Sequence, residues 1–79
     1  MAISPGALLV EDSYTSAFAY NGANLEYLGK ALPGSLKTAA AWQIKKLTYS
    51  GSDLTDIQYA DGNKDFDNIW NDRATYTYT

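Results

Sequence analysis

The sequence predicts a mainly β protein, a small antiparallel sheet of four to five short strands with one short helix, which we expect oligomerisation to complete. Short segments in which aromatic or β-branched residues alternate with polar ones, separated by the turn dipeptides Asn21-Gly22 and Pro33-Gly34, predict the strands. A core built from so few residues rarely supplies more than about 5 kcal/mol, and such domains are usually reinforced by disulfides, a metal or association. The 79 residues include no Cys and no His, so self-association is the reinforcement we expect.

An extended N-terminal arm, residues 1–24, is expected in front of a small β domain, residues 25–79. Tyr14, Phe18 and Tyr20 recur in this arm with the period of two that places side chains on one face of a strand. An aromatic arm on so small a domain has little core of its own to cover. We therefore expect it to lie on a neighbouring subunit or on another protein. A poorly ordered N-terminus is the alternative.

Two hairpins are expected along the chain. The first pairs residues 14–20 with residues 25–28 across the Asn-Gly dipeptide, and the second pairs residues 42–49 with residues 54–60 across a four-residue turn. A loop, residues 29–35, is expected between them, because its Pro-Gly dipeptide favours a turn and Pro cannot continue a central strand.

The alternation in the strand that opens the second hairpin changes phase at Lys45-Lys46. Trp42 and Ile44 share one face, whereas Leu47 and Tyr49 fall on the other. Either a β-bulge restores the face or both faces of this strand are partly buried.

A short helix and a terminal strand are expected in the last third. Phe66, Ile69, Trp70 and Arg73 recur at i, i+3, i+4 and i+7, which is the spacing of one helical face and predicts a helix of two turns at most. Thr and Tyr alternate in residues 74–79, a pattern of high β-propensity that predicts a strand.

Composition excludes several classes of function. The absence of Cys and His removes zinc fingers, thiol nucleophiles and Ser-His-Asp triads. A net charge of −3 opposes sequence-independent binding to nucleic acid. No apolar run approaches the roughly 18 to 20 residues needed to cross a bilayer. The start lacks the positive region of a signal peptide, so synthesis in the cytosol is expected. We expect no enzyme activity, no cofactor, and neither nucleic acid nor membrane as a partner.

The acidic turn near residue 61 allows a metal interpretation and a structural one. Asp61, Asn63 and Asp65 offer oxygens at alternate positions, as in a calcium loop. Such a loop needs Gly at its sixth position and Glu at its twelfth, where this chain has Phe66 and another Asp. We therefore expect no metal: Gly62 takes a positive φ in a turn, and Asn63 or Asp65 caps the short helix.

The aromatic side chains are the other candidates for function. Trp42, Tyr59, Phe66 and Trp70 could form a platform on which a sugar stacks, but rings at these positions more often belong to the core or to a subunit interface. We expect Arg73 to stack on a ring or to pair with a neighbouring Asp. The residues expected in the core or at an interface are Tyr14, Phe18, Tyr20, Trp42, Tyr59, Phe66 and Trp70.

Several motifs resemble a group of short proteins encoded in tailed-bacteriophage genomes. They are Tyr27-Leu28-Gly29-Lys30-Ala31-Leu32-Pro33-Gly34, Ala40-Ala41-Trp42-Gln43-Ile44-Lys45-Lys46-Leu47-Thr48-Tyr49, Tyr59-Ala60-Asp61-Gly62-Asn63, Phe66-Asp67-Asn68-Ile69-Trp70 and Arg73. The resemblance covers residues 25–79 and leaves the arm outside it. It implies a virion-associated structural protein and no catalytic residues.

The leading hypothesis is a non-enzymatic bacteriophage structural protein, located in the virion as a fibre, decoration or tail component. Its expected partners are further copies of itself, for example in a trimer, and other virion proteins, joined through aromatic-rich β surfaces. The alternatives are a receptor- or glycan-binding module of the particle and a small acidic inhibitor of a host protein.

Overall fold

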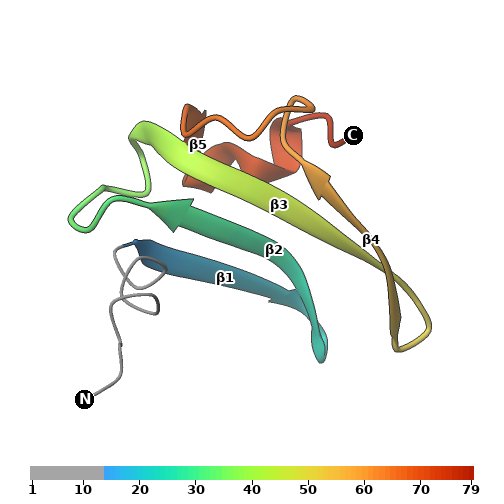
Figure 1. Cartoon of the computed structure of the whole chain (residues 1–79). Helices are drawn as coiled ribbons and strands as arrows, with labels where there is room; N and C mark the ends of the chain where they lie inside the picture. The colour runs from blue at the N-terminus through green and yellow to red at the C-terminus, as the bar shows by residue number, and fades with distance from the viewer. Residues whose placement is uncertain (1–13) are drawn as a thin grey trace, which may run out of the picture.

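The computed structural model describes residues 14–79, in which four strands form an antiparallel sheet in the order β1-β2-β3-β4 (Figure 1). A fifth strand pairs with β3, and a short 3-10 helix, η1, follows it. The prediction of a small antiparallel sheet with one short helix is confirmed. The bounds are Thr15–Asn21 for β1, Asn24–Ala31 for β2, Ala40–Ser50 for β3, Asp53–Tyr59 for β4, Asn68–Ile69 for β5 and Trp70–Thr75 for η1.

Both expected hairpins are present. β1 and β2 close at the pair Asn21 and Asn24, and Gly22 in the turn has φ 66°. β3 and β4 close in the same way around Gly51, which has φ 64°. A positive φ at these turns suits glycine, which has no Cβ to clash with the backbone. The expected boundary between residues 24 and 25 falls just inside β2 and so divides a single hairpin. Residues 1–13 of the expected arm lie outside the described residues.

β2 is longer than expected, because the chain does not leave the sheet after Leu28. Gly29, Lys30 and Ala31 continue the strand, so the expected loop over residues 29–35 begins too early. Gly29 stands in the strand for a packing reason: a Cβ there would lie 2.6 Å from the ring of Trp70. The turn itself is confirmed, since Gly34 has φ 89°.

β3 has both faces partly buried, which was the second of the two alternatives. Trp42 and Ile44 are buried on one face, while Leu47 and Tyr49 are partly buried on the other. The pairing with β2 and β4 runs without interruption through Lys45 and Lys46. The phase change in the sequence therefore reflects a strand that contacts side chains on both of its faces.

The expected helix over residues 66–73 is wrong in its first half. Asn68 and Ile69 form β5 instead, and η1 begins only at Trp70. Tertiary hydrogen bonds explain the difference: the Asn68 side-chain amide donates to the Asp61 carboxylate over 3.0 Å, and the Ile69 N–H donates to the Tyr76 hydroxyl over 2.8 Å. These bonds hold the segment extended despite its helical spacing.

The expected terminal strand over residues 74–79 is also wrong, since the only strand-like pairing there within residues 14–79 is a bridge between Ala60 and Tyr78. Tyr76 and Tyr78 both turn toward the sheet and pack against the core. The Tyr78 hydroxyl donates to the Arg73 carbonyl over 2.7 Å. Burial of these two rings therefore decides the conformation of the tail.

The core lies between the sheet and the C-terminal segment. The rings of Trp42 and Trp70 pack with their centroids 5.9 Å apart, and the Arg73 guanidinium lies 4.7 Å from the Trp70 ring centre. The expectation that Arg73 stacks on a ring is thus confirmed. Among residues 14–79 the buried apolar residues are Ala17, Ala31, Trp42, Ile44, Ala60 and Trp70.

Candidate functional site: the open face of the sheet

The C-terminal segment packs on one face of the sheet, and we call the opposite side the open face (Figure 1). Phe18 lies opposite Leu28, Leu28 opposite Lys45, and Lys45 opposite Tyr59. Directly paired residues project to the same side of a sheet, so the open face runs across all four strands. Its large apolar side chains are Phe18, Tyr20, Leu25, Leu28, Leu47, Tyr49, Leu54, Ile57 and Tyr59.

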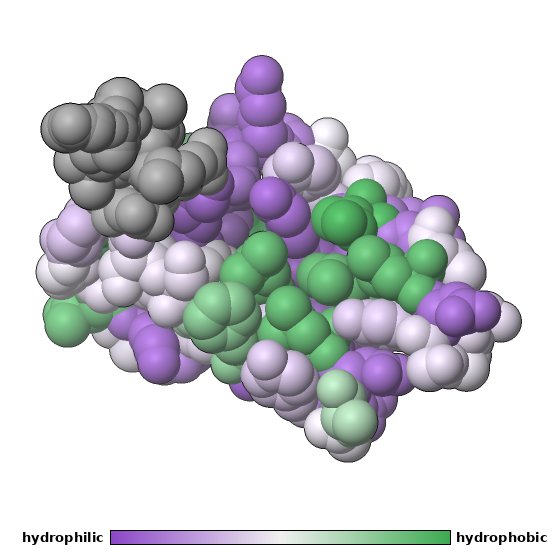
Figure 2. Space-filling model, turned by 60° about the horizontal axis from the view of Figure 1, so that its bottom comes forward, coloured by the Kyte–Doolittle hydropathy of each residue, from purple (hydrophilic) through white to green (hydrophobic). Residues whose placement is uncertain are grey.

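Much of this apolar surface is in contact with solvent. Phe18 is 58% exposed, Tyr20 64%, Leu54 48% and Ile57 53%. Figure 2 shows hydrophobic side chains gathered in one patch on this side of the molecule, with polar side chains around it. A contiguous apolar patch with a polar rim is typical of an interaction surface, because leaving such area in water is unfavourable.

The two lysines of this face lie beside aromatic rings. The Lys45 ammonium is 5.6 Å from the Tyr59 ring centre, and the Lys30 ammonium is 5.3 Å from the Tyr14 ring centre. In this position the charge is attracted to the ring while the aliphatic stem covers apolar area. The lysines thus extend the apolar surface while keeping their charges in water.

The loop after β4 closes one end of the open face. The Gln43 side-chain amide donates to the Lys64 carbonyl over 2.8 Å, and the Phe66 ring stacks on Tyr14 at 5.5 Å. A mostly apolar hollow of about 280 Å³ lies beside this stack and is lined also by Leu32, Ser35 and Ala41.

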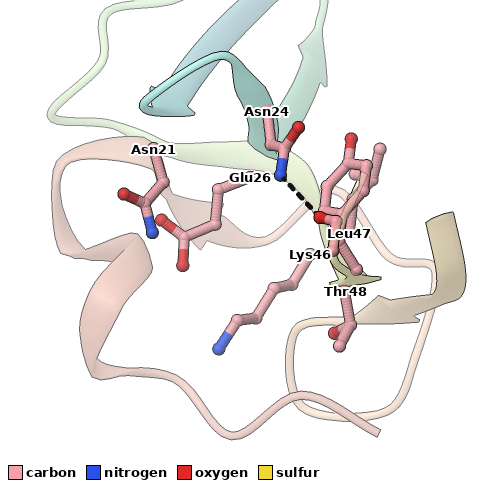
Figure 3. Close-up of a pocket in the computed structure, with 8 residues that line it drawn as sticks. Asn21, Asn24, Glu26, Lys46, Leu47 and Thr48 are labelled. Carbon is pink, nitrogen blue, oxygen red and sulfur yellow. Dashed lines mark hydrogen bonds between the residues drawn. The ribbon is translucent and has the colours of Figure 1, made fainter. Parts of the chain in front are cut away.

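A larger hollow of about 360 Å³ lies at the opposite end, between the tips of the two hairpins (Figure 3). The pairing of β2 with β3 stops at Tyr27 and Lys46, so the two hairpins separate beyond this point. The Asn24 side-chain amide bridges the gap by donating to the Gly51 carbonyl over 3.4 Å. The lining combines amides, hydroxyls, one carboxylate and one ammonium, a mixture that favours no particular ligand. The lining residues are Asn21, Asn24, Glu26, Lys46, Leu47, Thr48, Tyr49 and Gly51.

The structure distributes the predicted aromatic residues over three places. Trp42 and Trp70 lie in the core, where they are 2% and 4% exposed. Phe18, Tyr20 and Tyr59 project from the open face. The Tyr14–Phe66 stack closes one end of that face. Contact of any of these rings with a partner stays a prediction.

The acidic turn is held by hydrogen bonds within the chain. Gly62 has φ 71°, as predicted, and the preceding Asp61 has φ 58°. The Asn63 side-chain oxygen accepts from the Asp65 N–H over 3.0 Å. The expected cap is wrong, because η1 begins several residues later and no side chain caps it. The Asp61 carboxylate instead accepts from the buried Asn68 amide.

Within residues 14–79, no three residues of the types His, Cys, Asp and Glu gather closely enough to hold a metal ion. Every buried side-chain nitrogen and oxygen in this part of the chain has a hydrogen-bond partner. The described residues therefore contain no buried side-chain nitrogen or oxygen left open to a ligand. No helix in the same part is long and apolar enough to span a membrane.

The aliphatic half of the open face was not predicted from the sequence: Leu25, Leu28, Leu47, Leu54 and Ile57. Leu25 and Leu28 are three positions apart, as are Leu54 and Ile57, so a period of two places each pair on opposite faces. The register shifts bring each pair to one face, and the strand order places the four strands side by side. In comparisons with protein-family models, curated proteins and solved structures, no match was found.

Proposed function

We propose that this chain is a non-enzymatic structural protein of a bacteriophage virion that associates with further copies of itself through the open face of its sheet. The observation that carries the proposal is the exposure of Phe18, Tyr20, Leu54 and Ile57 on one contiguous surface. A second copy is the favoured occupant, because two such faces are alike in being apolar at the centre and polar at the rim.

The dimensions of the sheet are adequate for a stable contact. Four strands about 4.8 Å apart, each about seven residues long at a rise of about 3.3 Å, present a projected face of roughly 440 Å². Side chains roughen this surface, so two copies packed face to face would bury on the order of 1,000 Å², the lower bound for a specific interface. Association would also reinforce a small core, in which Trp42 and Ile44 are the largest fully buried side chains of residues 14–79.

The assignment to a virion rests on the sequence resemblance to short phage-encoded proteins. A fibre, decoration or tail component is present in many copies, and a repeated subunit with an apolar sheet face suits that use. The glycan-binding alternative has less support, because Trp42 and Trp70 are buried and leave no exposed tryptophan for a sugar. The inhibitor alternative requires a host protein on the open face in place of a second copy.

The test is the mass in solution of the wild type and of two lysine variants. Ile57→Lys places a charge among the apolar side chains of the open face, on β4. Thr48→Lys places the same charge on an exposed β3 residue whose side chain points to the opposite side. We expect the wild type to form oligomers at micromolar concentration in sedimentation velocity. Ile57→Lys should dissociate them, and Thr48→Lys should leave them intact.

Three outcomes would count against the proposal. We expect oligomers at micromolar concentration, so a wild-type mass of one chain even at 100 µM contradicts self-association. Equal effects of Ile57→Lys and Thr48→Lys contradict the role of the open face. Absence of the 8.7 kDa chain from purified virions, measured by mass spectrometry, contradicts the virion assignment.

A further inference from the structure

We propose that β1 is a second self-association element, and that two copies pair antiparallel through their β1 edges to form one continuous eight-stranded sheet. The inference rests on the proposed function and adds a different contact surface to it. β1 lies at one edge of the sheet, and among the described residues it pairs only with β2 (Figure 1). An edge strand presents backbone N–H and C=O groups to which a further strand can bind.

β1 lacks most of the features by which proteins protect an edge strand. Its pairing with β2 shifts register between Ala19 and Tyr20, but the extra residue, Glu26, lies in β2 and leaves β1 itself regular. Its residues, Thr15–Asn21, include no charged side chain and no Pro. Lysine, other charges and proline on an edge prevent pairing with another chain. β1 is also seven residues long, so a partner strand can add a complete ladder.

The opposite edge of the sheet is protected. At its C-terminal end, Tyr59 of β4 exchanges two backbone hydrogen bonds with Thr79, at 3.1 and 3.2 Å. The rest of β4 carries Asp53 and Asp56, and its pairing with β3 shifts register near the N-terminal end of β4, where one residue of β4 is left unpaired. Two acidic strands side by side would repel each other, so β1 is the edge suited to a second copy.

The registers show which backbone groups of β1 face outward. The Ala60 N–H donates to the Ile44 carbonyl over 3.0 Å, so the backbone groups of Ile44 point toward β4 and away from β2. Ile44 lies opposite Gly29, and Gly29 lies opposite Ala17. In an antiparallel sheet the backbone groups of residues paired across the strands point alternately to one side and the other. The groups of Gly29 therefore point toward β1, and those of Ala17 point inward, to β2.

Ser16, Phe18 and Tyr20 accordingly present their N–H and C=O groups at the free edge. A two-fold axis at Phe18 would pair Phe18 with its own copy and Ser16 with Tyr20 of the other copy. Each pair would exchange two hydrogen bonds, and the alternate pairs on the core side would join small alanines. The open faces of both copies would then form one apolar surface, with a dimer, not a trimer, as the basic unit.

Disulfide cross-linking tests this register, because the chain has no Cys of its own. Ser16→Cys and Tyr20→Cys should form a mixed disulfide dimer when the two variants are combined under mild oxidation, since paired Cα atoms lie about 5.5 Å apart. Each variant alone should cross-link at least tenfold more slowly, because equal residues would lie four positions, or about 13 Å, apart. Equal rates for the mixture and the single variants would overturn the register.

A proline variant separates the edge from the open face. Ser16→Pro removes one outward N–H from each copy and keeps the bonds to β2, so about a tenfold or larger rise in the dimer Kd is expected. Ser16→Ala, which keeps this N–H at the same position, is the matched control and should leave the Kd unchanged. Circular dichroism should show that both variants keep the sheet.

The combined results distinguish the two proposals. If Ile57→Lys dissociates the oligomer while Ser16→Pro does not, the edge pairing is wrong and the proposed function stands. If Ser16→Pro alone dissociates it, the edge pairing stands and the open face is not the contact. A wild type that remains a single chain at 100 µM overturns both.

Discussion

Gly29→Ala is the substitution that most directly tests the packing of the core. Gly29 lies in the middle of β2, and a Cβ there would be 2.6 and 2.7 Å from two ring carbons of Trp70 and 3.0 Å from a ring carbon of Trp42. Heavy atoms do not approach this closely, and both indole rings are buried. The added methyl group must therefore displace the Trp70 ring or separate η1 from the sheet.

The expected cost follows from two opposing terms. Overpacking a core by one methyl group costs about 1 to 3 kcal/mol. Replacing Gly by Ala reduces the entropy of the unfolded chain, which returns about 0.4 to 1 kcal/mol. The net loss in the free energy of unfolding is roughly 1 to 2 kcal/mol. For a domain of this size it corresponds to a fall in Tm of roughly 5 to 15 °C.

Thermal and urea unfolding followed by tryptophan fluorescence would measure this loss, because both tryptophans of the chain lie in the affected core. Protein concentration must be held constant, since association shifts the apparent stability. Trp70→Leu supplies the control: in that background Gly29→Ala should cost much less, because the clashing ring is absent. A Gly29→Ala protein as stable as the wild type would refute the packing of Trp70 on β2.

Three further predictions concern the core, the turn and the tail. Trp42→Ala should lower the free energy of unfolding by about 3 to 5 kcal/mol in urea titrations, since Trp42 is 2% exposed; retention of wild-type stability would contradict its place in the core. Gly62→Val should cost about 1 kcal/mol or more by the same measurement, because Gly62 has φ 71° and a Cβ would lie 2.5 Å from the Thr79 hydroxyl; an unchanged midpoint would contradict this turn geometry. Burial raises the pKa of Tyr78 above its ordinary value, with a further contribution from the neighbouring tyrosines. The folded protein then keeps the Tyr78 hydroxyl proton at pH values where the unfolded chain has lost it. The contribution of this group to the free energy of unfolding is therefore complete below a pH of about 10 and is lost as the pH rises above that value. Tyr78→Phe should reduce this alkaline loss in pH-dependent melts, at the cost of the hydrogen bond to the Arg73 carbonyl, and an equal alkaline loss in the variant would contradict the assignment.

The sequence by itself determined the local elements of the sheet. The dipeptide Asn21-Gly22 and the four-residue link 50–53, each between two segments with a strand pattern, predicted both hairpins. In the structure Gly22 and Gly51 are each the first residue of a two-residue turn and have a positive φ, which is a local property of the turn. The positive φ of Gly62 was predicted on the same grounds. Period-two alternation likewise placed Trp42 and Ile44 together on the face that became the core.

Tertiary structure decided the C-terminal third and the open face. The helical spacing of residues 66–73 was overridden by hydrogen bonds from Asn68 and Ile69 to partners seven residues away, which no local pattern encodes. Gly29 stayed in β2 because Trp70, 41 positions later in the chain, packs on it. The open face exists because the C-terminal segment packs on one side of the sheet only. Period-two alternation shows which residues share a strand face, but it does not show which of two apolar faces becomes covered. That choice depends on long-range packing.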